Sequence, residues 1–96
     1  MDVVIHVFSV AVEDPDGHSY RARAMGRQRR DATWIGWLEF TPSGSGGIVR
    51  RTERETTQPS ERAIRYWALG LELAYLEGAL ERAVRGSPPL MDTEKP

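Results

Sequence analysis

Six residues of this chain have side chains suited to holding a single strand of nucleic acid. Guanidinium groups bind phosphates, and bases stack on an aromatic ring. The six are Arg21, Arg23, Arg27, Trp37, Arg50 and Arg54. Alternation along the expected strands places the first three on one face, with Trp37 nearby and outward-facing. The plainer interpretations are a solvated sheet face with one exposed tryptophan, or a contact surface for another protein.

The charge balance favours the plainer interpretations. The chain has 13 basic and 14 acidic residues and a net charge of −1, which argues against a strong general attraction to nucleic acid or acidic membranes. Residues 20–58 carry eight Arg against four acids, a local excess of only four charges. Nucleic-acid binding is therefore the alternative, and a solvated face or a protein contact is favoured.

Other residue types that could do chemistry lack the spacing for it. His6 lies within an expected strand and His18 beside a turn, and neither has neighbours at metal-ligand or catalytic-triad spacing. Glu53 and Glu55 could form a carboxylate pair, but Arg51 and Arg54 interleave with them and indicate a solvated ion-pair edge.

Two backbone features could hold an anion. The glycine-rich loop at 44–47 lacks the lysine and the following helix of a phosphate-binding loop, so it is expected to be a hairpin loop. Residues 56–59 form a strand-to-helix junction, where a helix N-terminus can hold an anion. We expect no enzyme, metal or cofactor; a catalytic site would need completion by a second subunit.

The elements that would position these residues are four strands followed by one helix. Apolar and polar alternation and turn residues predict strands over 3–13, 18–27, 33–41 and 48–56, and a helix over 59–85. Asp14-Pro15-Asp16-Gly17 has the composition of a tight turn. Short connections imply an antiparallel meander with the helix packed across one face, an α+β domain over 1–86 with a tail over 87–96. The first strand is apolar on both alternating faces, which is typical of a strand buried on both sides.

The expected helix has two apolar stripes. Pro59 suits its first position, Thr57 or Gln58 its N-cap, and Gly86 its C-terminal end. One stripe, Ile64, Trp67, Leu71, Ala74, Tyr75 and Gly78, is assigned to the sheet. The other is Tyr66, Leu69, Leu73, Leu76, Leu80 and Val84.

The second stripe predicts a homo-oligomer. A straight helix of about 26 residues spans roughly 39 Å and would overhang a sheet about 19 Å across, leaving this stripe for a second copy of the same helix. The alternative is that the N-terminal half of the chain wraps around and covers both faces.

The composition also bears on the compartment. No cysteine is present, which excludes disulfides and thiolate metal sites. The first apolar run has Asp2 and no basic start, and no run approaches the roughly 20 residues of a membrane span. We expect a cytoplasmic protein.

Three sequence blocks carry a family resemblance: YRARAMGR at 20–27, WIGWLEF at 34–40, and RETTQP to YLEGALERA across 54–83. With them the chain resembles a group of small bacterial proteins to which no function is assigned. At the level of fold only, four strands and a long helix are similar to a PUR repeat or a Whirly domain. Such domains bind single-stranded nucleic acid, which is what that similarity implies.

The sequence as a whole predicts a small non-catalytic homo-oligomeric interaction module that binds another protein. The alternative is a single-stranded nucleic-acid-binding protein that uses the arginine-rich sheet face.

Overall fold

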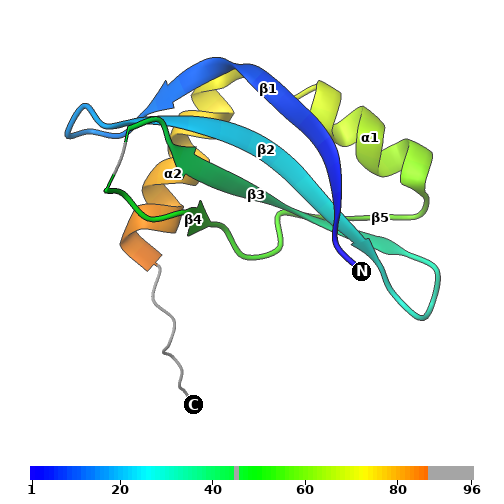
Figure 1. Cartoon of the computed structure of the whole chain (residues 1–96). Coiled ribbons are helices and arrows are strands. Elements are labelled where there is room, and N and C mark those ends of the chain that lie inside the picture. Colours follow the sequence, from blue (N-terminus) through cyan, green and yellow to red (C-terminus); the bar gives the residue numbers. More distant parts are fainter. Residues whose placement is uncertain (45, 87–96) are drawn as a thin grey trace.

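The computed structural model describes residues 1–44 and 46–86, and the tail predicted over 87–96 lies outside these residues. Five strands form one antiparallel sheet, and two helices lie together on one of its faces (Figure 1). The elements are β1 (Val3–Glu13), β2 (Ser19–Gln28), β3 (Trp34–Pro42), β4 (Arg50–Arg51), β5 (Thr56–Gln58), α1 (Glu61–Leu69) and α2 (Leu73–Gly86). The α+β class and the antiparallel sheet are confirmed.

The first three strands form a meander in the order β1-β2-β3. The turn predicted at 14–17 joins β1 to β2. In it Asp14 Oδ1 accepts the backbone N–H groups of Asp16 and His18 at 2.9 Å, and Gly17 has a φ of 85°, which suits glycine. Strands β2 and β3 then pair without interruption from Tyr20 opposite Pro42 to Gln28 opposite Trp34.

Strand β1 lies at an edge of the sheet and is not buried on both sides, so that expectation was wrong. Its pairing with β2 shifts register twice, between Val4 and His6 and between Val7 and Ala11. Such bulges bend a strand and make an edge harder to extend with another strand. The apolar residues on the uncovered side, Val4, Val7 and Val10, are exposed.

The fourth strand predicted over 48–56 is interrupted and forms two short strands, β4 and β5, which both pair with β3. Thr52 separates them. Its side-chain Oγ1 accepts the N–H of Leu38 at 3.0 Å, and its own N–H donates to the Leu38 carbonyl at 2.9 Å. The N–H of Leu38 thus bonds to the Thr52 hydroxyl and not to a backbone carbonyl, and the regular backbone pairing with β3 stops there.

The single helix predicted over 59–85 is two helices. It begins one residue after the N-cap Ser60, whose Oγ accepts the Ala63 N–H at 3.1 Å, so neither Thr57 nor Gln58 caps it. At the end of α1 the Gly70 N–H bonds to the carbonyls of Tyr66 and Trp67, and Leu71 N–H bonds to Ala68 O. The bonds to Trp67 and Ala68 span three residues instead of four, so they tighten the last turn and end α1.

A straight helix was expected to extend beyond the edge of the sheet, and the break between α1 and α2 removes this overhang. Gly70 is unfavourable inside a helix, and the partly buried Leu71 packs against the core. The chain therefore changes direction after α1, and α2 packs on the same face of the sheet. Within the described residues no helix is long and apolar enough to cross a membrane.

The core lies between the helices and the sheet. The small residues of β2 lie under the helices, with Ala22 and Ala24 fully covered. The buried cluster consists of Ile5, Phe8, Val12, Tyr20, Ala22, Ala24, Leu38, Phe40, Ile64, Ala68, Leu76, Ala79, Leu80 and Ala83. Among residues 1–44 and 46–86, no helix lies over the opposite face of the sheet (Figure 1).

Candidate functional site

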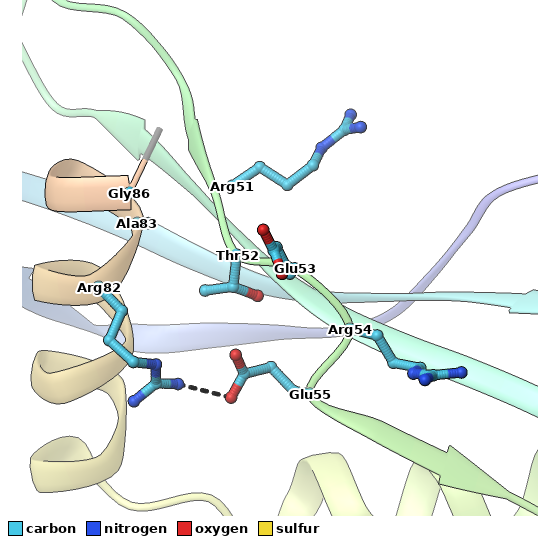
Figure 2. A pocket seen from close by; sticks show the side chains of 8 residues that line it. All are labelled: Arg51, Thr52, Glu53, Arg54, Glu55, Arg82, Ala83 and Gly86. Atoms are coloured by element: carbon cyan, nitrogen blue, oxygen red, sulfur yellow. Dashed lines mark hydrogen bonds and ion pairs between the residues drawn. The ribbon is translucent and has the colours of Figure 1, made fainter. Parts of the chain in front are cut away.

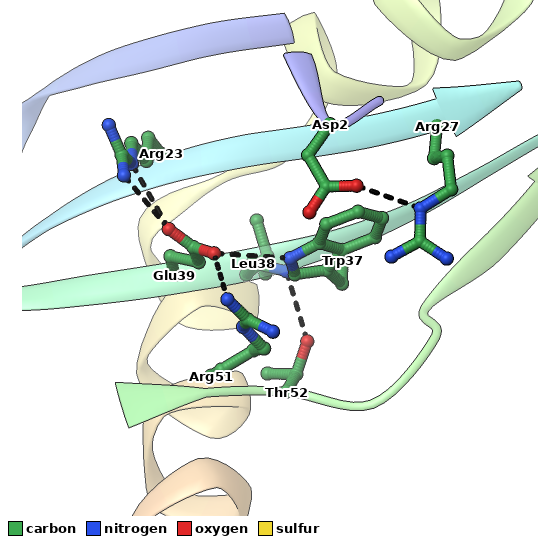
Figure 3. A network of polar contacts seen from close by, with 8 residues as sticks. All are labelled: Asp2, Arg23, Arg27, Trp37, Leu38, Glu39, Arg51 and Thr52. Atoms are coloured by element: carbon green, nitrogen blue, oxygen red, sulfur yellow. Dashed lines mark hydrogen bonds and ion pairs between the residues drawn. The ribbon is translucent and has the colours of Figure 1, made fainter. Parts of the chain in front are cut away.

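The face of the sheet without helices, hereafter the open face, is organised around the carboxylate of Glu39 on β3 (Figure 3). Arg23 donates its Nε and Nη2 to Glu39 Oε1 at 3.3 and 3.0 Å, and Arg51 Nη2 lies 2.9 Å from Oε2. The indole Nε1 of Trp37 donates to Oε2 at 3.4 Å. The Glu39 side chain is only 6% exposed, whereas those of Arg23 and Arg51 are 44% and 60% exposed. The anion therefore lies beneath its cationic partners.

Trp37 lies on the predicted face of the sheet, but Arg27 lies over its ring and it is only 5% exposed, so the prediction of an exposed tryptophan was wrong. The guanidinium carbon of Arg27 lies 5.4 Å from the centre of its ring. Arg27 Nε also donates to Asp2 Oδ1 at 2.7 Å, and this bond holds the pKa of Asp2 below its usual value of 3.8. The neighbouring Met25 is likewise buried. On the open face, the Arg27 side chain thus covers part of the Trp37 ring.

The structure brings together four of the six residues predicted to bind nucleic acid. Arg21, Arg23 and Arg27 share the open face with Trp37, and Arg51 joins them. Arg50 pairs opposite Phe40, a core residue, so it points toward the helix side of the sheet.

Arg54 lies instead at a cleft of about 290 Å³ between residues 51–55 and α2 (Figure 2). Here the side chain of Glu55 is only 10% exposed and accepts hydrogen bonds from Arg82 Nη2 at 2.6 Å and from the hydroxyl of Tyr75. Burial and then the bond to Glu55 raise the pKa of Tyr75, and the bond to Glu55 raises the pKa of Arg82. Arg82 and Tyr75 both bond to this carboxylate, so the three side chains connect α2 to the segment between β4 and β5.

Three possible metal ligands meet at the first turn, where ligand atoms of Asp14, Asp16 and His18 lie within 4.8 Å of one another. Asp14 Oδ1 accepts two backbone N–H groups, and Oδ2 lies 3.3 Å from His18 Nδ1. Burial by itself would raise the pKa of Asp14. The hydrogen bonds from the N–H groups of His18 and Asp16 outweigh burial, so the pKa of Asp14 is lowered. The bonds of Asp14 within the turn thus explain why these three side chains lie together.

The second apolar stripe of the helix does not form one face. Leu76 and Leu80 are buried in the core of the chain itself, and Val84 is partly buried against it, so these three are not available as predicted to a partner. Tyr66, Leu69 and Leu73 remain 81%, 66% and 40% exposed. They flank the break between α1 and α2, and we call these three residues the elbow patch.

The sequence pointed to the open face but missed its centre. Strand alternation does place Glu39 on the same side as Trp37, and an antiparallel hairpin could bring Arg23 opposite it. The actual pairing of Arg23 with Glu39 depends on the register of β2 and β3. That register is set by the loop after β2, where Arg29 N–H bonds to Thr33 O and Ala32 has a φ of 73°. The bond of Glu55 to Arg82 joins positions 27 residues apart and has no local signal.

Comparisons with known proteins add no constraint to this geometry. No protein-family model, curated protein or solved structure matches the chain. The resemblance stated from the three sequence blocks stays a prediction, as does the fold-level similarity to PUR-repeat and Whirly domains.

Proposed function

We propose that the protein is a non-catalytic interaction module that forms a homodimer through the elbow patch and binds another protein. The observation that carries this proposal is the exposure of Tyr66, Leu69 and Leu73 on consecutive turns around the helix break. A chain that buries its other helical leucines so completely leaves these three large side chains in water.

The size of the elbow patch supports a dimer. From the exposed fractions, the three side chains present roughly 400 Å², within the range in which the largest patch of a monomer is often functional. Two copies would hide about 800 Å² of apolar surface, half of a standard interface, and a polar rim would supply the remainder. At about 25 cal/mol per Å² this is about 20 kcal/mol before the cost of association, which is of the order of 4–15 kcal/mol.

A second copy is the partner that this patch fits most simply. When two copies meet about a twofold axis, each elbow patch covers the other, and neither patch is left to recruit a third chain. Six side chains, including two tyrosines, then lie at the centre of the interface, where aromatic residues contribute most.

The surroundings of the buried carboxylates support a non-catalytic role. Glu39 and Glu55 are each held by arginine and by an aromatic N–H or O–H group, so neither is placed to accept a proton from a substrate. The proposal locates the module in the cytoplasm, in keeping with a cysteine-free chain that gains no stability from an oxidising environment.

Single-stranded nucleic acid is the second candidate partner, favoured by the arginines of the open face. It requires a platform on which bases stack, and Trp37 lies under Arg27. The remaining attraction would be to the phosphates alone.

Disulfide trapping tests the interface, because the chain contains no cysteine of its own. A single Leu69→Cys substitution in the middle of the patch is expected to give a covalent dimer under mild oxidation. Val49→Cys is the matched control, since Val49 is similarly exposed at 56% but lies before β4. Equal trapping at both positions would indicate random collision, and no trapping at position 69 would count against the elbow interface.

A further inference from the structure

We propose that the open face is a docking site for an extended segment of a partner protein that carries acidic side chains at every second position. This inference rests on the proposed function only in taking the partner to be a protein. It concerns the face opposite the helices, so it does not depend on the elbow patch.

Three of the four arginines of the open face are held by carboxylates and still have unused N–H donors. Arg23 gives two of its N–H groups to Glu39, and Arg51 and Arg27 each direct one nitrogen to a carboxylate. A guanidinium has five N–H donors in a rigid fork. The bonds to Glu39 and Asp2 therefore orient each fork and leave most of its donors for an anion above the sheet.

The local charge is positive although the whole chain carries −1. Arg21, Arg23, Arg27 and Arg51 stand against Asp2, Glu13 and Glu39, which is four positive charges minus three negative, or +1. The Glu39 carboxylate lies at the bottom of this group, and the half-exposed guanidinium groups lie above it. A ligand that approaches the open face meets the cations first, and an anionic ligand complements them.

The spacing of the cations matches an extended peptide. Arg21 and Arg23 are two residues apart on β2, and Arg27 follows four residues later. At about 3.4 Å per residue these side chains stand roughly 7 and 14 Å apart along the strand, and an extended peptide presents its own alternate side chains at the same interval. Arginine and carboxylate can then meet in two-pronged hydrogen bonds at successive positions.

Apolar groups beside the arginines favour a peptide over a bare polyanion. Val4 lies opposite Met25 and Val7 opposite Arg23 in the β1–β2 pairing, and these two valines are 42% and 56% exposed. They offer apolar contacts to the CH₂ groups of the acidic side chains that face the sheet. No aromatic side chain among the described residues is exposed on this face, because Tyr66 and Tyr75, the exposed aromatics, belong to the helices.

The test is the binding of a fluorescein-labelled peptide that alternates Glu and Thr over about 12 residues, a length that spans β2 when extended. Fluorescence anisotropy is measured at low salt with three probes. These are the alternating peptide, a peptide of the same composition with all its Glu in one block, and an oligothymidylate of equal charge. We expect the alternating peptide to bind most tightly and its affinity to fall with added salt.

Two charge reversals locate the site. Arg21 is exposed on β2 and takes part in none of the bonds to Glu39, so Arg21→Glu leaves the Arg23–Glu39–Arg51 group intact and is expected to weaken binding about tenfold. Arg62→Glu makes the same charge change on the helix side and is expected to leave affinity within about twofold.

Three other outcomes would overturn the proposal. Absence of saturable binding would remove the site, equal losses in both variants would indicate a general charge effect, and tighter binding of the oligothymidylate would assign the face to nucleic acid. If the peptide fails to bind while Leu69→Cys still traps a dimer, the docking site is wrong and the elbow interface stands. If the peptide binds and no dimer is trapped, the elbow interface is wrong and the docking site stands.

Discussion

Ile64 of α1 lies over Gly36 of β3 so closely that the strand has no room there for a side chain. A Cβ placed on Gly36 would be 2.9 Å from Ile64 Cδ1, 3.1 Å from Trp67 Cζ3 and 3.1 Å from Thr56 Cγ2. This approach lets α1 pack directly on the sheet backbone, and Ile64 is fully buried as a result.

Gly36→Ala is therefore expected to destabilise the fold by about 1–3 kcal/mol, because Ile64, Trp67 or Thr56 must shift to admit the methyl group. Urea unfolding followed by tryptophan fluorescence measures the change. Gly44→Ala is the control, since a Cβ there meets nothing within 4 Å and its stability should stay within about 0.5 kcal/mol. An unchanged midpoint for Gly36→Ala would show that the helix sits farther from β3.

Glu39→Ala is expected to cost about 1–3 kcal/mol, because Arg23, Arg51 and Trp37 lose the acceptor they share. The comparison is Glu61→Ala, which removes a surface ion pair to Arg65 in which both side chains are about half exposed. That loss should be near 0.5 kcal/mol. Thermal unfolding of both variants decides the matter, and equal effects would mean that Glu39 is as well solvated as Glu61.

Ser60→Ala should destabilise the protein by about 1 kcal/mol, since it removes the acceptor of the Ala63 N–H at the start of α1. Thr57, one of the two N-caps predicted from the sequence, lies instead in β5 with its side chain exposed. Thr57→Ala is thus expected to change stability by less than about 0.5 kcal/mol. Chemical denaturation of both variants measures which substitution costs more stability. A larger loss for Thr57→Ala would indicate that the helix begins at Thr57 and not at Ser60.

Acid should weaken the turn between β1 and β2. The N–H groups of His18 and Asp16 overcome the effect of burial and hold the folded pKa of Asp14 below 3.8, the value for an unfolded chain. The carboxylate therefore stabilises the fold fully above pH 3.8, and this contribution is lost as the pH falls through the folded pKa. Asp14→Asn is expected to show a smaller drop in melting temperature than the unmodified chain between about pH 5 and pH 2. Equal drops would show that the turn does not depend on the charge.

The first half of the fold was readable from sequence because its signals are local. Alternation fixed the bounds of β1, β2 and β3 to within a residue or two, and the Asp14–Gly17 turn has a composition that few other structures use. The interrupted strand was missed because the role of Thr52 depends on its distance from Leu38, which is 14 residues away.

The helix break was missed for an energetic reason. Gly70 costs only about 1 kcal/mol within a helix, so the sequence alone tolerates it there. What decides the break is the burial of Leu71, Leu76 and Leu80 against a short sheet, a tertiary effect. Trp37 was placed on the correct face of the sheet, but its burial depends on Arg27, which folds over the ring from the adjacent strand.

The elbow interface is tested most directly by sedimentation equilibrium over a range of micromolar concentrations. The unmodified chain of 10.8 kDa should sediment as a dimer of twice that mass, 21.6 kDa. Leu69→Glu places a charge in the middle of the elbow patch and is expected to give a folded monomer, because Leu69 makes no part of the core. Val49→Glu, at an exposed site away from the helices, should remain a dimer. A mass of 10.8 kDa for the unmodified chain at every concentration, or an unchanged dimer in Leu69→Glu, would contradict the interface proposed here.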